Sequence, residues 1–168
     1  MGREVRMVPA DWEHPTDRRG YRPLFDGSKF RKELEEWNLN KAKWDEGLVA
    51  SYTRDNEWIA RDIENEETSS FEEYYGRRPS PYDYMPEWKP EERTHFMMYE
   101  TTTEGTPISP IFATAEELAH WLADNNASAF ADMTCTYEQW LGTIRRGSSI
   151  SAVITDGVLQ PGTVLNEK

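Results

Sequence analysis

Carboxylates are the side chains in this sequence with the widest chemical scope, and they gather in one stretch. Residues 55–92 hold twelve acidic and four basic side chains, so this stretch carries net −8 of the chain's net −12. From residue 71 onward, six large aromatic residues lie among them: Phe71, Tyr74, Tyr75, Tyr82, Tyr84 and Trp88. Clustered carboxylates can act as acid–base pairs, ligate hard cations or attract a basic partner, and aromatic rings can anchor an interface.

Acid–base catalysis by these carboxylates has little support in the sequence. It would need surroundings that drive the pKa values of two carboxyl groups apart, and no motif marks such a pair. A calcium loop would need a glycine and a terminal glutamate at fixed offsets, and both are absent around Asp62–Glu67. We therefore predict no catalytic residue and no cofactor, and a small-molecule enzyme remains only a second alternative.

Transition-metal ligands are few and scattered. They are His14, His95, His120 and Cys135. None has the spacing of a CxxC or HExxH site, so we predict no metal site. His120 lies next to Trp121 in an expected helix and is interpreted as a partly buried structural histidine. Cys135 precedes the cap of another helix, whose N-terminus could lower the thiol pKa, but a packed and unreactive thiol is the favoured interpretation.

A binding surface is the use that best fits acidic and aromatic side chains in one stretch. Carboxylates spaced along helices can imitate the phosphates of a duplex, so a nucleic-acid-binding protein could accept them in place of DNA. The predicted contact residues are Asp62, Glu64, Glu66, Glu67, Glu72, Glu73, Tyr74, Tyr75 and Trp88. Two other interpretations stay open, a protein–protein adaptor that uses the aromatic rings, and a solvated face without a partner.

Composition limits the location and the partners. The 168 residues suffice for one domain or two small ones, and the single cysteine excludes an internal disulfide. We expect a cytoplasmic protein, because no apolar leader opens the chain and no apolar run is long enough to cross a bilayer. A net charge of −12 repels phosphate backbones and anionic lipids, so we expect neither direct nucleic-acid binding nor membrane binding.

The elements of the first half are mainly helical. Residues 3–9 alternate weakly and predict a strand, and a helix is predicted over 28–46, capped by Asp26 or Ser28 and ended by Gly47. Apolar side chains recur on one face of that helix: Phe30, Leu34, Trp37, Trp44 and Leu48. A second helix is predicted over residues 55–65. Ser70 and Glu73 have capping-box spacing, which predicts a short helix that Gly76 stops.

Residues 77–90 contain four prolines, which exclude a continuing helix and predict an extended segment. Its aromatic side chains Tyr82, Tyr84 and Trp88 are expected to pack on the body of the protein.

The C-terminal half has the most regular pattern. A strand is predicted over 94–101, a turn at Glu104-Gly105 and a return over 106–112. Two capping boxes predict helices over 114–124 and 136–146, and Asp156-Gly157 predicts a hairpin. The expected fold class is α+β with a small antiparallel sheet and two helices in this half. The expected parts are an N-terminal helical part, 1–76, a Pro-rich aromatic connector, 77–93, and a C-terminal α+β module, 94–168.

Four segments resemble an uncharacterised family of small acidic proteins from phages and prophages of proteobacteria. They are HFMMYETTTEGTPISPIFATAEELAHWLADN (95–125), TYEQWL (136–141), VPADWEHP (8–15) and YMPEW (84–88). The family has no established activity, so the resemblance implies a mobile-element origin and no catalytic residue. Anti-restriction and anti-CRISPR proteins share this small, acidic character. We therefore expect an inhibitor that mimics DNA and binds a basic, nucleic-acid-binding defence protein of the host.

Overall fold

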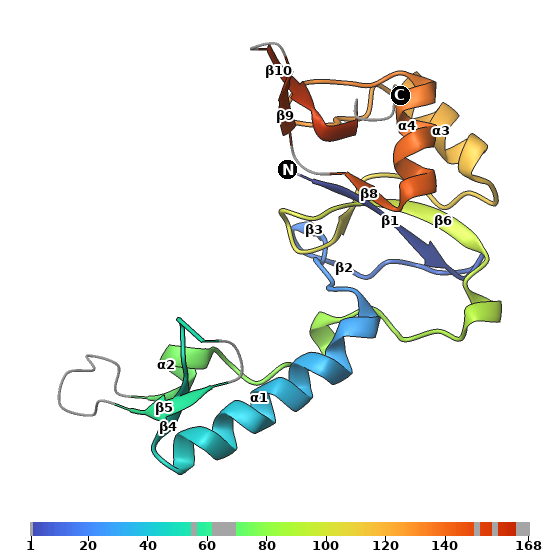
Figure 1. The fold of residues 1–168 in the computed structure, drawn as a ribbon. Coiled ribbons are helices and arrows are strands. Elements are labelled where there is room, and N and C mark those ends of the chain that lie inside the picture. Colours follow the sequence, from blue (N-terminus) through green and yellow to red (C-terminus); the bar gives the residue numbers. More distant parts are fainter. Residues whose placement is uncertain (1, 55–56, 62–69, 150–151, 156–157, 164–168) are drawn as a thin grey trace. The chain divides into compact units, whose positions relative to one another are not determined.

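The computed structural model describes residues 2–54, 57–61, 70–149, 152–155 and 158–163, which fold as a mixture of helices and antiparallel strands (Figure 1). This confirms the α+β class. The chain divides into two compact units. We call Met1–Leu24 with Glu87–Lys168 the sheet unit, and Phe25–Pro86 the helix unit. The boundaries between the units fall after Leu24 and after Pro86, whereas the expected boundaries were after residues 76 and 93.

The sheet unit is built around an antiparallel sheet in the order β7-β6-β1-β8. Its strands are β1 (Arg3–Val8), β6 (His95–Glu100), β7 (Thr106–Pro107) and β8 (Ser148–Ser149). Strand β1 pairs with β6 along its whole length, with Val5 opposite Met98. The strand predicted near the N-terminus is thus confirmed, but it lies between strands from the second half of the chain. Arg3 anchors it, because its buried guanidinium bonds Glu100 at 3.0 Å and the Ser128 carbonyl oxygen at 2.7 Å.

Two capped helices of the sheet unit bury the main apolar cluster. They are α3 (Ala115–Asp124) and α4 (Tyr137–Arg146), and both predicted capping boxes form, at Thr114 with Glu117 and at Thr136 with Gln139. The cluster includes Met98, Leu118, Leu122, Trp140 and Ile144. Helix α4 ends at Gly147 with φ 94°, a conformation that glycine adopts without strain. Both helix predictions are therefore confirmed.

Short hairpins complete the sheet unit. Strands β9 (Ala152–Thr155) and β10 (Val158–Pro161) pair with Val158 opposite Thr155, as predicted, although the turn residues Asp156 and Gly157 lie outside the described residues. Strands β2 (Thr16–Asp17) and β3 (Gly20–Tyr21) form a second hairpin.

The helix unit begins with a 3-10 turn, η1 (Gly27–Lys29), and the long helix α1 (Phe30–Asp45). Asp26 caps η1 by accepting a hydrogen bond from the Ser28 amide at 2.8 Å. Strand β4 (Leu48–Ala50), strand β5 (Trp58–Ala60) and helix α2 (Phe71–Tyr75) follow. The entering and leaving chains of this unit pair with each other, because the Phe25 amide donates to Asp83 and the Met85 amide donates to Phe25, both at 2.9 Å.

The helix predicted over residues 55–65 is wrong for the part that the structure describes. Trp58–Ala60 forms strand β5, which pairs with β4 in antiparallel register. Aromatic and β-branched side chains such as Trp58 and Ile59 favour strands, and the strand partner lies ten residues upstream, beyond the reach of a helical pattern. Residues 55–56 and 62–65 of the predicted helix lie outside the described residues.

The Pro-rich segment 77–90 is extended apart from single 3-10 turns. These are η2 (Pro81–Asp83) and η3 (Pro90–Glu92), each opened by a proline. Tyr84 is buried, but Tyr82 is 75% exposed, so the expected packing of Tyr82 is wrong. Prolines leave few rotatable bonds, and the turn η2 directs the Tyr82 side chain into solvent while Tyr84 packs against Phe25 and Phe30.

Within the described residues, no helix is long and apolar enough to span a membrane.

Candidate partner-binding surface

The predicted contact residues divide between the described and undescribed parts of the chain. Asp62, Glu64, Glu66 and Glu67 lie outside the described residues. Glu72, Glu73, Tyr74 and Tyr75 all belong to helix α2 of the helix unit, and Trp88 belongs to the sheet unit. Helix α2 therefore holds the described part of the acidic and aromatic surface.

The aromatic residues of α2 fasten it to α1. Phe71 packs edge-on against Trp37 and Trp44, with ring centroids 5.1 and 5.8 Å apart. Tyr74 and Tyr75 pack against Trp44 at 5.5 and 6.2 Å, and the Tyr75 hydroxyl accepts a hydrogen bond from the Ala50 amide at 3.1 Å. The rings of Tyr74 and Tyr75 therefore stabilise the unit and present only part of their surface to solvent.

The acidic residues of α2 point outward. Glu72 and Glu73 are both exposed. Glu73 closes the predicted capping box, since its carboxylate accepts a hydrogen bond from the Ser70 amide at 3.0 Å. A carboxylate held by a capping bond at a helix N-terminus is fixed in one place, which suits it to a fixed display of negative charge.

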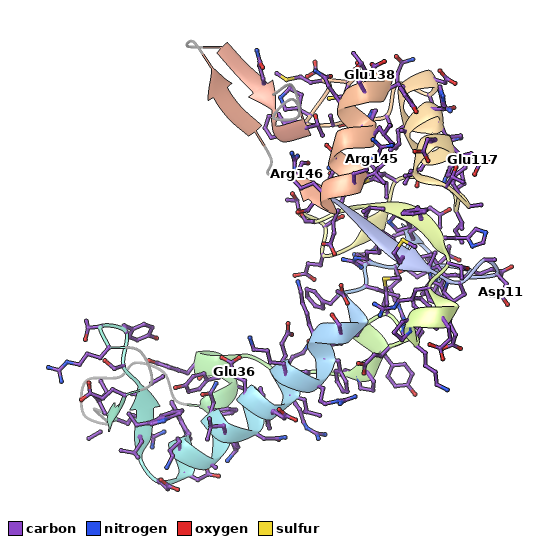
Figure 2. All side chains as sticks on the ribbon, turned by 45° about the vertical axis from the view of Figure 1, so that its right-hand side comes forward. Asp11, Glu36, Glu117, Glu138, Arg145 and Arg146 are labelled. Atoms are coloured by element: carbon purple, nitrogen blue, oxygen red, sulfur yellow. The ribbon has the colours of Figure 1, made fainter. Side chains whose placement is uncertain are left out.

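A pocket of about 250 Å³ lies where α1 meets the residues after α2. Its lining residues are Glu33, Glu36, Trp37, Asn40, Tyr75 and Pro79. The first four share one side of α1, because residues three, four and seven apart fall on the same helix face. Figure 2 labels Glu36 on this helix. The pocket thus combines two carboxylates with the rings of Trp37 and Tyr75.

Hydrogen bonds fix the walls of this pocket. The Trp37 indole N–H donates to the Gly76 carbonyl oxygen at 3.2 Å. The Tyr84 hydroxyl donates to the Glu33 carboxylate. Burial of Tyr84, together with this bond and the charge of Glu33, raises the pKa of the Tyr84 hydroxyl well above its usual range. Tyr84 therefore remains a neutral donor and orients Glu33.

Ion pairs neutralise many of the other charges in the helix unit. Lys41 pairs with Asp45 at 2.5 Å, Lys43 with Glu46 at 2.7 Å and Arg77 with Asp83 at 2.9 Å. Among the described residues, no base forms an ion pair with Glu36 or Glu72. Both carboxylates can attract a cationic side chain, and the neighbouring rings of Trp37 and Tyr75 can add cation–π attraction.

Glu33 and Glu36 were not among the predicted contact residues, because the prediction relied on the density of acidic residues and both lie outside 55–92. Their signal was the three-residue spacing next to Trp37 on a predicted helix, which places the carboxylates and the indole on one face.

Trp88 has a structural role in the sheet unit. Its ring packs edge-on against Trp12, with centroids 4.8 Å apart. It lies in a different unit from α2, so the predicted contact residues do not all belong to one unit.

The isolated His and Cys residues are also part of the sheet unit. His120 is exposed and stacks on Tyr137 at 4.1 Å, so the expectation of a partly buried histidine is wrong. It lies on the outer side of α3, one position after the buried Ala119. Cys135 is a packed thiol, as predicted. Its sulfur lies 2.6 Å from the Thr163 hydroxyl, and burial raises the pKa of the thiol against a smaller lowering by that contact.

No group of three or more His, Cys, Asp or Glu side chains in the described part of the chain could hold a metal ion. No family model, no curated protein and no solved structure matches this chain.

Proposed function

We propose that this protein is a phage- or prophage-encoded inhibitor that binds a basic, nucleic-acid-binding defence protein in the host cytoplasm. The helix unit supplies the contact surface, with the pocket of Glu33, Glu36, Trp37 and Tyr75 and the carboxylates of α2. The observation that carries the proposal is this pocket, where carboxylates and aromatic rings converge without a basic residue in the lining.

A channel that binds DNA presents Arg and Lys side chains at intervals set by the phosphates. An Arg side chain can pair with a carboxylate and stack on an aromatic ring at the same time. Glu36 beside Trp37 and Tyr75 offers both contacts, and Glu72 adds a second carboxylate on α2. The resemblance to phage-encoded acidic proteins supports an inhibitor of the host over other acidic binding proteins.

A protein–protein adaptor is the second candidate, and exposed apolar side chains of the helix unit favour it. Tyr52 is 87% exposed, Leu39 is 51% exposed and Ile59 is 44% exposed. An adaptor of this kind would bind through apolar contacts, and its affinity would depend little on salt.

Affinity capture from host lysate separates the two candidates. The bait is the full chain, and two variants are compared with it. Glu36→Lys/Glu72→Lys changes the proposed surface, and Asp124→Lys/Asp132→Lys is the control on exposed acidic residues of the sheet unit. Both raise the formal net charge from −12 to −8.

The proposal predicts that the unaltered chain captures a protein that binds DNA or RNA, and that added duplex DNA displaces this protein from the bait. The variant Glu36→Lys/Glu72→Lys should fail to capture the protein, and the control should still capture it. Capture that is equal for all three baits and insensitive to duplex DNA would refute DNA mimicry. If only a third variant, Tyr52→Ala, fails to capture the partner, the adaptor is favoured.

A further inference from the structure

The sheet unit contains a separate pocket of about 300 Å³ beside the β2–β3 hairpin. Its lining residues are Trp12, Glu13, His14, Tyr21, Met97, Pro110 and Ile111. Asp11, labelled in Figure 2, marks the loop after β1 that carries Trp12, Glu13 and His14. None of these residues belongs to the acidic stretch or to the helix unit.

Three of the lining rings meet almost at right angles. The planes of Trp12 and His14 make an angle of 85° with centroids 6.0 Å apart, and those of His14 and Tyr21 make an angle of 85° with centroids 5.7 Å apart. All three rings also line the pocket, so they border the same space. Such an aromatic cage is the arrangement that proteins use to bind alkylated ammonium ions.

The cage is fixed before any ligand arrives. Trp12 packs on Trp88, and its indole N–H donates to the Tyr99 hydroxyl at 3.3 Å. Tyr21 lies in β3, opposite Thr16 of β2. Rings held in place by packing and strand pairing lose little entropy on binding a ligand, which favours affinity.

His14 contributes a neutral ring to this cage. Burial lowers its pKa, the hydrogen bond to the Arg22 backbone partly opposes this, and the nearby charges of Arg6 and Arg22 add smaller lowering contributions. One ring nitrogen, Nε2, lies 2.7 Å from the Arg22 carbonyl oxygen and donates its proton to it, which leaves Nδ1 as an acceptor 3.4 Å from the Tyr99 hydroxyl. A neutral imidazole does not repel a cation in the pocket.

The charged side chain in the described lining of the pocket is a carboxylate, whereas the guanidiniums of Arg6 and Arg22, which lower the pKa of His14, are not part of that lining. Glu13 is exposed, and among the described residues that line the pocket it alone is charged. The guanidinium of Arg6 lies over the Tyr99 ring, bonds the Leu24 carbonyl oxygen at 2.6 Å and pairs with Glu4 at 3.3 Å, and it is absent from the lining. A ligand therefore meets one carboxylate, three rings and the apolar walls of Met97, Pro110 and Ile111.

We propose that this pocket binds an alkylated ammonium group, such as a quaternary amine or a methylated lysine side chain. Alkyl groups on the nitrogen fit the apolar walls and weaken hydration, the positive charge is attracted to the ring faces, and Glu13 completes the site. The inference is independent of the proposed function, because it rests on residues of the other unit.

Choline and its neutral isostere 3,3-dimethylbutanol test the proposal on the full chain. The readout is the indole N–H resonance of Trp12 in a nitrogen–proton correlation spectrum, assigned with Trp12→Phe. We expect a saturable shift with choline and at least a fivefold weaker response to the neutral isostere. A peptide with trimethyl-lysine distinguishes the sources, because it binds more tightly than choline if the natural ligand is a modified side chain.

The variants are chosen to spare the fold. Tyr21 is 51% exposed and Glu13 is exposed, so Tyr21→Leu and Glu13→Gln should leave the structure intact and weaken choline binding about threefold or more. The matched controls, Tyr52→Leu and Glu138→Gln, change exposed residues elsewhere and should bind as the unaltered chain does. Equal shifts with choline and the isostere, or no shift with either, would overturn the proposal.

Discussion

The indole N–H of Trp37 donates a hydrogen bond to the carbonyl oxygen of Gly76 at 3.2 Å. This bond joins the middle of α1 to the residue that ends α2. Because Tyr75 directly precedes Gly76, the same bond holds the Tyr75 ring beside Glu36 in the pocket of the helix unit. The proposed contact surface is therefore as rigid as the attachment of α2 to α1.

Trp37→Phe tests this attachment. The phenyl ring can still pack on Phe71, but the hydrogen bond to Gly76 is lost, so we expect the helix unit to lose about 1 kcal/mol of unfolding free energy. Urea denaturation followed by circular dichroism measures the change, with Tyr52→Phe as the control on an exposed ring. Unchanged stability would mean that ring packing alone holds α2 in place.

Gly105 and Gly147 form a matched pair of left-handed glycines, with φ 99° and 94°. A Cβ at Gly147 would meet no heavy atom within 4 Å, so Gly147→Ala should cost only the backbone strain of about 1 kcal/mol. A Cβ at Gly105 would lie 2.0 Å from the Leu24 carbonyl oxygen and 2.7 Å from the Arg6 guanidinium. We expect Gly105→Ala to cost roughly 3 kcal/mol or more in chemical denaturation. Equal losses would exclude the close contact at Gly105.

Tyr99 should make the sheet unit sensitive to alkaline pH. Burial raises the pKa of Tyr99 to about 12, whereas an unfolded chain ionises its tyrosines near pH 10. Above about pH 10 the unfolded state releases a proton that the folded state keeps, so stability falls as pH rises towards 12, by about 2 kcal/mol.

Unfolding free energy measured between about pH 9 and pH 12 provides the check. Tyr99→Phe should flatten the decrease relative to the unaltered chain, although it also removes the hydrogen bond from Trp12. Tyr52→Phe, on an 87% exposed ring, should keep the decrease. The same pH dependence in both variants would contradict the assignment to Tyr99.

Cys135 should react slowly while the protein is folded. Its thiol is buried, lies against Thr163 and has a pKa raised by burial, so both access and thiolate content are low. We expect a thiol-specific disulfide reagent at neutral pH to modify the folded protein at least roughly tenfold more slowly than the urea-unfolded protein. Equal rates in the two states would show that the thiol is accessible.

Local signals in the sequence were enough to predict the capped helices. The boxes at Ser70, Thr114 and Thr136 all form, and the glycines at 76 and 147 end their helices, since caps depend on residues within a few positions of each other. The position of β1 could not be predicted in this way. It pairs with β6 about ninety residues later, and a strand pattern does not identify its partner.

The candidate site depends on the same kind of long-range contact. The density of acidic residues predicted the contact residues of α2 but not Glu36. Glu36 belongs to the candidate site because it lines one pocket with Trp37, Tyr75 and Pro79. Similarly, Trp58 was predicted in a helix because its pairing with Ala50 lies outside any local pattern. Sequence pattern therefore predicted the elements well and the contacts between them poorly.

The most direct test of the acidic surface is the salt dependence of the dissociation constant for the captured partner. For the unaltered chain we predict that Kd rises at least roughly tenfold between about 50 and 300 mM salt, because charge attraction is screened. Glu36→Lys/Glu72→Lys should bind more weakly at low salt and show a flatter dependence, while Asp124→Lys/Asp132→Lys should keep the steep dependence of the unaltered chain. If Kd and its salt dependence are the same for all three proteins, the carboxylates of the helix unit do not contact the partner.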